Sequence, residues 1–320
     1  MASSLKTLAL AALAATAAAL PGAQRLSARQ LQYHELVVRQ NAAAAAQGLS
    51  DPDILQFALT LENLEEAFYR EGFQKFKESD FTALGLNKQQ VNDLLSIGRS
   101  EQTHVELLQS SLAQAGVKPV QPCTYDFKFT DAKGMVGTAA VLENVGISAY
   151  MGAAPLLADK GILSTAASIL TVEARHQSSI RIFAGLQAVP QAFDSPLGPR
   201  AVFSIAKPFI TACPKGSDLA IQAFPTLTMK AGQKAATTVG STLMLQADGG
   251  AGAGAKFCAF TSGGVLPGGT AFANFTDAGG CQVPEGVAGV SYLSLTKTAP
   301  LDGVLKDELV LAGPLVVIVS

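Results

Sequence analysis

Hydrophobic residues recur every three or four positions between residues 51 and 190, which is the spacing of helices that bury one face. The first helix is predicted to begin at Ser50-Asp51-Pro52, where two capping candidates precede a proline suited to the first turn. Its buried face is expected to carry Leu55, Ala58, Leu59, Glu62, Glu65, Tyr69 and Phe73. Three further helices are predicted from about Asn87 to Gly116, from Asp131 to about Leu157, and from after Gly161 to about Val189.

The lengths of the connections predict how these helices are joined. Short links join the first helix to the second and the third to the fourth, so each pair is expected to form an antiparallel hairpin. The 14 residues between Gly116 and Asp131 can span about 46 Å when extended. A helix of about 28 residues is about 42 Å long. The link can therefore run the length of a four-helix bundle as a single long crossover.

After residue 200 the pattern changes to short β-rich runs separated by glycine and proline. The runs are Thr226–Met229, Ser241–Gln246, Lys256–Phe260, Val290–Thr296 and Leu315–Val319. They predict a small antiparallel β-sandwich-like domain, so the fold class is α+β. We predict a signal peptide at 1–19, a linker at 20–50, the bundle at 51–190, a connector at 191–214 and the β-rich domain at 215–320.

Charge and composition narrow the classes of partner. The net charge is −2, there is no basic cluster and there is no tryptophan, so a nucleic-acid partner is not expected. Lys6 precedes an apolar run and the small residues Ala17-Ala18-Ala19, which is the order of a secretory signal peptide cleaved near Ala19. No later segment reaches the ~20 apolar residues that span a bilayer. We therefore predict a secreted, extracellular protein.

An oxidising compartment favours disulfide bonds between the four cysteines. Cys258 and Cys281 lie close together in the sequence and are the preferred first pair, which leaves Cys123 with Cys213. Four cysteines allow three connectivities, so the alternatives stay open. Asn274-Phe275-Thr276 is a glycosylation sequon in a glycine-rich stretch that should be exposed, so Asn274 is a predicted glycosylation site.

Two of the three histidines lie in Glu-x-x-His motifs, Glu101 to His104 and Glu173 to His176. Residues three apart share a helical face, so each motif can present a carboxylate and an imidazole to one point. The other two helices carry a glutamate followed seven residues later by a tyrosine. These pairs are Glu62 with Tyr69 and Glu143 with Tyr150. The order therefore occurs twice, which predicts two hairpins related by a pseudo-dyad.

One glutamate from each of two helices and Glu-x-x-His from each of the others is the ligand set of di-iron and di-manganese carboxylate bundles. The six predicted metal ligands are Glu62, Glu101, His104, Glu143, Glu173 and His176. Four carboxylates balance two divalent ions, and oxygen-rich ligation suits two Fe or two Mn ions. Glu65 is a rival to Glu62, which we prefer for its symmetry with Glu143. The alternative hypothesis places Glu101 and Glu173 on solvated helix faces beside core histidines.

The stretch Ala58-Leu59-Thr60-Leu61-Glu62-Asn63-Leu64-Glu65-Glu66-Ala67-Phe68-Tyr69 resembles the fungal and plant desiccation- or stress-related branch of the ferritin-like superfamily. The resemblance covers residues 51 to 190. It implies that Glu101 and Glu173 bridge the metals, and that the terminal ligands are Glu62, Glu143, His104 and His176. It also implies that Tyr69 and Tyr150 hydrogen-bond ligands or lie on an electron path; the alternative is two ordinary buried tyrosines.

Two functions from different classes follow from this site. The first is a redox activity in the stress response, oxidase or peroxide-detoxifying, with O2 or peroxide as substrate. The second is a non-enzymatic stress or cell-surface protein in which the metals are structural and the β-rich domain binds a cell-wall or protein partner. Iron storage is disfavoured, because a secreted chain with a large extra domain differs from cytoplasmic cage ferritins. The reaction and the oligomeric state stay open.

Overall fold

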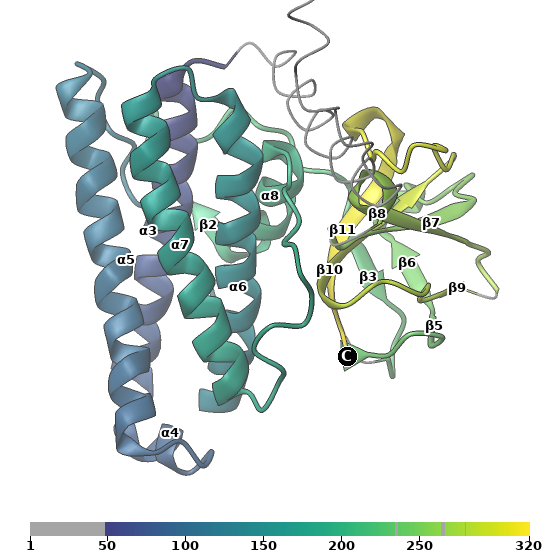
Figure 1. Ribbon diagram of the computed structural model, residues 1–320, viewed down its shortest axis with the longest axis horizontal. Helices are drawn as coiled ribbons and strands as arrows, with labels where there is room; N and C mark the ends of the chain where they lie inside the picture. Colours follow the sequence, from purple (N-terminus) through teal and green to yellow (C-terminus); the bar gives the residue numbers. More distant parts are fainter. Residues whose placement is uncertain (1–48, 234–235, 264–265, 279) are drawn as a thin grey trace, which may run out of the picture.

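The computed structural model describes residues 49–320 apart from 234–235, 264–265 and 279 (Figure 1). The predicted signal peptide and nearly all of the predicted linker lie outside the described residues. The described chain has a helical region followed by a region rich in antiparallel sheet, and the two lie side by side (Figure 1). The predicted α+β class is confirmed.

Four long helices of the described chain form the bundle. They are α3 (Asp51–Lys75), α5 (Lys88–Gln114), α6 (Ala132–Ala153) and α7 (Lys160–Phe183). Three begin where the sequence predicts, and the fourth begins at Lys160, just before Gly161 instead of after it. A short helix, α4 (Glu78–Thr82), lies in the link between α3 and α5. The most extensive helix–helix contacts are α3 with α5 and α6 with α7, which are the two predicted hairpins.

Capping side chains set the beginnings of these helices. Ser50 and Asp53 form a capping box at α3, and Asn87 and Gln90 form another at α5. Asp131 accepts a hydrogen bond of 2.7 Å from the Gly134 backbone N–H at the start of α6. Each cap satisfies backbone donors that have no partner inside the helix, which explains why the beginnings could be predicted.

The ends of the last two helices differ from the prediction. The α-helical part of α6 ends at Ala153, and a 3-10 turn, η1 (Ala154–Leu156), replaces the final turn that was predicted. Helix α7 ends at Phe183, six residues before Val189. Gly185 has a φ of 72°, and the Leu186 N–H donates to the Arg181 carbonyl at 2.8 Å. This left-handed glycine closes the helix early, as glycines at helix ends commonly do.

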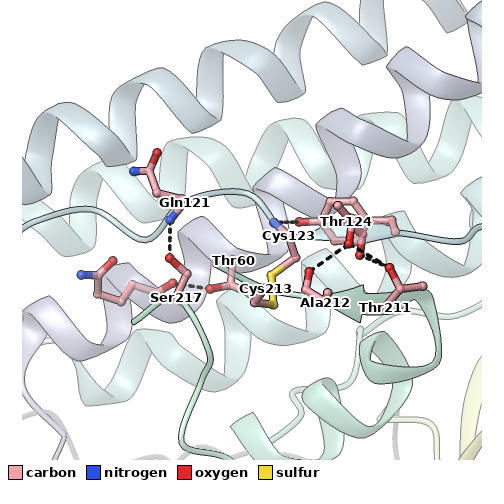
Figure 2. Close-up of a disulfide and its surroundings, with 10 residues drawn as sticks. Thr60, Gln121, Cys123, Thr124, Thr211, Ala212, Cys213 and Ser217 are labelled. Atoms are coloured by element: carbon pink, nitrogen blue, oxygen red, sulfur yellow. Dashed lines mark hydrogen bonds between the residues drawn. A yellow bond between two sulfur atoms is a disulfide. The ribbon is translucent and has the colours of Figure 1, made fainter. Parts of the chain in front are cut away.

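The long crossover between α5 and α6 is tied to a segment that follows the bundle. Strand β1 (Thr124–Tyr125) in the crossover pairs with β2 (Ile210–Ala212). The Cys123–Cys213 disulfide joins the same two segments, and Ser217 accepts a hydrogen bond of 2.9 Å from the Gln121 N–H (Figure 2). This pair, one of the two that the sequence favours, is therefore present in the structure.

Within its described residues, the β-rich region contains one five-stranded sheet and two short ones. The large sheet has the order β4 (Ala236–Thr237), β11 (Val310–Val319), β10 (Gly289–Thr296), β7 (Phe257–Thr261), β8 (Thr270–Asn274). The short sheets pair β3 (Leu227–Met229) with β6 (Leu245–Ala247) and β5 (Thr242–Leu243) with β9 (Cys281–Gln282). All pairings are antiparallel except β4 with β11.

Each of the five predicted runs contains strand, although the run at 241–246 divides into β5 and β6 and β11 begins five residues earlier than predicted. The strands β4, β8 and β9 were not predicted. Side chains from all three sheets, among them Leu227, Leu243 and Phe260, form one hydrophobic core. The second preferred disulfide, Cys258–Cys281, joins β7 to β9. Asn274 is exposed at the end of β8, as a glycosylated asparagine would need to be.

From Ala139 to Tyr150 helix α6 is buried at nearly every residue, because the β-rich region packs against it. The short helix α8 (Pro199–Ala206) contacts both α6 and β11 (Figure 1). From β10, the buried Tyr292 hydroxyl receives a hydrogen bond of 2.8 Å from Asn144 Nδ2 and lies 2.8 Å from Ser148 Oγ. These contacts position the face of α6 that carries Glu143. In the described part of the chain, no helix has both the length and the apolar character that a membrane span requires.

Candidate metal centre

The four long helices bring six buried polar side chains to one point in the middle of the bundle. They are Glu62 from α3, Glu101 and His104 from α5, Glu143 from α6, and Glu173 and His176 from α7. They form two overlapping groups of four residues, and within each group the donor atoms lie within 4.8 Å of one another. One group is Glu62, Glu101, His104 and Glu173, and the other is Glu101, Glu143, Glu173 and His176. Glu101 and Glu173 belong to both groups, which is the position that bridging ligands would occupy. Neither of these two carboxylates is exposed to solvent, against the alternative of solvated helix faces.

His104 faces three carboxylates through a single nitrogen. Its Nδ1 lies 3.1 Å from Glu101 Oε2, 3.2 Å from Glu173 Oε1 and 3.3 Å from Glu62 Oε2. One nitrogen carries at most one hydrogen, so it cannot satisfy three carboxylates by hydrogen bonding. Two ligand atoms bound to one cation at about 2.1 Å lie roughly 3 Å apart when they are adjacent. The spacing therefore fits a shared cation.

His176 has the corresponding position in the other group. Its Nδ1 lies 2.8 Å from Glu101 Oε1 and 3.2 Å from Glu143 Oε2. Its second nitrogen, Nε2, lies 2.9 Å from Ser100 Oγ. A hydrogen bond at the far nitrogen orients the ring of a metal-binding histidine. Ser100 was missed from the sequence, because nothing distinguishes it there from the other serines of α5.

The two tyrosines connect opposite helices. Tyr69 of α3 donates to Glu143 Oε1 on α6, and Tyr150 of α6 donates to Glu62 Oε1 on α3 at 2.5 Å. The structure thus places both hydroxyls on predicted ligands, and the exchange between α3 and α6 follows the pseudo-dyad. Each tyrosine leaves the second oxygen of its glutamate facing a histidine Nδ1.

Several buried oxygens of this cluster have no hydrogen-bond partner among the described residues. They are Glu62 Oε2, Glu101 Oε1 and both oxygens of Glu173. A buried carboxylate oxygen without a partner is strongly unfavourable, and a bound cation would satisfy it. The donor set of carboxylates and imidazoles is also one that divalent transition metals accept. The cluster is therefore compatible with metal binding.

Burial and mutual repulsion change the protonation of the cluster. Burial and then the charge of Glu101 raise the pKa of Glu173 well above its usual range. Burial and the charge of Glu143 raise the pKa of Glu101 to about 7. Burial opposes protonation of His104, yet the facing carboxylates of Glu101, Glu173 and Glu62 raise its pKa to about 12. The metal-free cluster therefore binds protons where a loaded cluster would bind cations.

The same balance of causes applies to His176. Burial disfavours its charged form, but the carboxylates of Glu101 and Glu143 raise its pKa to about 10. Because an imidazole must lose its Nδ1 proton before that atom can bind a metal, cation binding is coupled to proton release.

Glu65, the rival to Glu62, lies beside the cluster and outside both groups of candidate ligands. It is buried, and burial followed by repulsion from Glu173 raises its pKa well above the usual range. Gly146 of α6 borders the same point, since a Cβ built there would lie 2.8 Å from Glu173 Oε2 and 3.1 Å from Glu65 Oε1. Gly146 was missed, because the sequence does not distinguish it from the other glycines of α6.

A bundle of four helices with buried carboxylates and imidazoles at its centre is typical of helical proteins that bind metals through these side chains. Residues 50–186 match the family model for the ferritin-like domain, so this part of the chain is a ferritin-like domain. The chain is also 27% identical over 178 residues to protein rds1 of Schizosaccharomyces pombe. That alignment covers 55% of this chain and 44% of rds1, so the chain spans less than half the length of this curated relative.

Proposed function

We propose that this chain is a secreted ferritin-like protein whose bundle holds two Fe or two Mn ions in a carboxylate-bridged centre that acts on O2 or peroxide in a stress response. The observation that carries the proposal is the set of unpartnered buried oxygens on Glu62, Glu101 and Glu173 that face two histidine Nδ1 atoms. The two disulfides support an oxidising, extracellular environment.

The composition of the two groups supports a role for each proposed ligand. Glu101 and Glu173, which belong to both groups, would bridge the ions. The terminal ligands would be Glu62 and His104 on one side and Glu143 and His176 on the other. With neutral imidazoles, the four carboxylates would balance the charge of two divalent ions, so the loaded centre would be stable in a buried position. When bound, the ions would supply electron transfer to O2 or peroxide.

The remaining side chains orient the ligands and hold protons. Ser100 orients the ring of His176, and the hydroxyls of Tyr69 and Tyr150 each fix one carboxylate oxygen of Glu143 and Glu62. Burial holds protons on both tyrosines, because it raises each pKa well above the usual range, with further contributions from the hydrogen-bonded glutamates. The two hydroxyls therefore stay hydrogen-bond donors near neutral pH.

Elemental analysis of the purified full chain tests the proposal. We expect about two equivalents of Fe or Mn in the wild type after metal loading, and their loss in Glu101→Ala/His176→Ala. The matched control, Glu106→Ala/Arg175→Ala, changes exposed residues on the same two helices and should keep the metal. Absence of metal from the loaded wild type would remove the proposal, and turnover of O2 or peroxide by loaded protein would support its redox part.

The alternative is a structural role for the metal in a non-enzymatic protein whose β-rich region binds a cell-wall or protein partner. One observation favours it: the ligands come from all four long helices, so a bound cation would fasten the whole bundle. Two measurements on the loaded protein would favour this alternative: a chelator lowers its melting temperature, and the protein shows no turnover of O2 or peroxide.

A further inference from the structure

A cavity of about 440 Å³ lies between the four long helices and ends at the carboxylate–histidine cluster. Its outer end is formed where α3 and α7 begin and where α5 and α6 end, at the top of the bundle in Figure 1. Its inner end is formed by Glu62, Glu65, Gly146 and Tyr150. Along α3 the lining runs from Pro52 to Glu65, a separation of 13 residues that corresponds to about 20 Å of helix.

The wall between these two ends is mostly apolar, although Ser111 and Thr165 also line the cavity. Leu55, Ala58, Leu108, Ala166 and Ile169 are among its residues. Of the described residues that line the cavity, the ones with charged side chains are Glu62 and Glu65 at the inner end and Asp159 at the outer end. Asp159 is already engaged as the cap of α7. A hydrated cation would lose its water along such a wall without gaining ligands, so the cavity is unsuited to conducting metal ions.

The size and chemistry of the cavity define what it can bind. Its volume falls within the ~300–1,000 Å³ range of small-molecule sites, which are mostly apolar with a few polar groups at one end. None of the described residues that line the cavity is Lys, Arg or His, so an anionic head group at the inner end would lose its hydration without gaining a cationic partner. A neutral molecule can instead bury hydrocarbon against the wall and place one end beside Glu65 and Tyr150.

We propose that this cavity is the binding site of a neutral, predominantly hydrocarbon molecule whose inner end lies beside the carboxylate–histidine cluster. Binding depends on the cavity alone, whereas the role of this molecule as a substrate rests on the proposed function. The inference adds to that function a substrate class larger and more apolar than O2 or peroxide.

Fluorescence titration of the full chain with N-phenyl-1-naphthylamine, a neutral apolar probe, tests the proposal. We expect one site per chain in both metal-free and metal-loaded protein. Dodecanol should displace the probe, and dodecanoate should do so at least tenfold more weakly. A wild type that does not bind the probe, or that binds the anion as well as the alcohol, would overturn the proposal.

A matched pair of variants on α7 assigns the site. Ala166 lines the cavity, whereas the next residue, Ala167, is exposed on the same helix. Ala166→Phe should weaken probe binding at least tenfold, and Ala167→Phe should leave it unchanged, with cooperative melting verified for both. If Ala166→Phe does not fold, Ala58→Leu fills the cavity from α3 and should weaken binding in the same direction. Unchanged binding in a folded cavity variant would overturn the proposal.

Elemental analysis of the same samples separates the two proposals. Protein that holds metal and does not bind the probe would overturn the cavity assignment and leave the metal centre intact. Protein that binds the probe at the cavity and holds no metal after loading would support the binding site and remove the proposed function.

Discussion

Gly146 allows the backbone of α6 to approach Glu173 and Glu65 more closely than a residue with a side chain would. Gly137, on the same helix, has no atom within 4 Å of the corresponding Cβ position. The two glycines share the same helix-propensity disadvantage relative to alanine, roughly 0.5–1 kcal/mol. Replacing each glycine by alanine therefore distinguishes an effect on the carboxylate–histidine cluster from an effect on helix stability.

Gly146→Ala should lower metal content, because the new methyl group displaces a proposed bridging carboxylate. Gly137→Ala should keep the metal and raise the free energy of unfolding by roughly 0.5–1 kcal/mol, since it is an exposed helix position. Elemental analysis and urea unfolding of both variants measure the two effects. Equal metal content in both would show that the close approach at Gly146 is unrelated to the site.

Ser100 makes the two halves of the cluster unequal, because it contacts the far nitrogen of His176. Removing a hydrogen bond that orients a metal-binding histidine commonly lowers metal affinity by about 10- to 100-fold. Ser100→Ala should therefore weaken one of the two sites by that factor in a chelator competition. Ser110→Ala removes an exposed hydroxyl from the same helix and should leave both affinities unchanged.

At the scale of elements, the two disulfides fasten very different lengths of chain. Cys123 and Cys213 are separated by 90 residues and join the crossover to the segment after the bundle, whereas Cys258 and Cys281 are separated by 23 residues within the β-rich region. A longer closed loop restricts the unfolded chain more strongly. The crossover disulfide should therefore contribute more to stability.

Replacing both cysteines of each pair by serine tests this ordering. The chain-entropy relation gives a loss of about 4.6 kcal/mol for the Cys123–Cys213 pair and about 3.4 kcal/mol for the Cys258–Cys281 pair. Denaturant unfolding of both double variants measures the difference. A larger loss from the shorter loop would show that native contacts around that disulfide dominate over the restriction of the unfolded chain.

At the scale of the whole molecule, the metal-free protein should become less stable as the pH rises. The pKa of Glu101 is raised from 4.5 to about 7, that of His176 from 6.5 to about 10, and that of His104 from 6.5 to about 12. Each group binds its proton more tightly in the folded state than in the unfolded state. Its contribution is complete below the unfolded value and is lost as the pH rises through the folded value.

Thermal melts of metal-free protein should therefore show a falling melting temperature between about pH 4.5 and pH 10. Loading with Fe or Mn should reverse the trend near neutral pH, because the cations replace the protons in the cluster. The double variant Glu101→Ala/His176→Ala serves as the control and should show a weaker dependence in both conditions. A metal-free protein whose stability rises over this range would contradict the assignment.

Features that depend on one helix could be predicted from the sequence. Ser50, Asn87 and Asp131 cap helices because their side chains satisfy neighbouring backbone donors. Glu101 and His104 share a face because residues three apart always do in an α-helix. Glu62 and Tyr69 share a face for the same reason, because seven residues make about two turns. The β-strands were predicted less completely, since short strands such as β4 and β9 depend on partners distant in the sequence.

Features that depend on how helices face each other were decided by the tertiary structure. Periodicity places Glu62 and Glu65 on the same buried face of α3. Only the rotation of that helix against its neighbours puts Glu62 into a candidate ligand group and Glu65 beside it. The exchange of tyrosine hydrogen bonds between α3 and α6 and the apolar cavity are likewise properties of packed surfaces. The sequence by itself determined which residue types share a helical face, because helix geometry is local. Which atoms meet depends on the distance and rotation between helices, which the packing of the whole core sets.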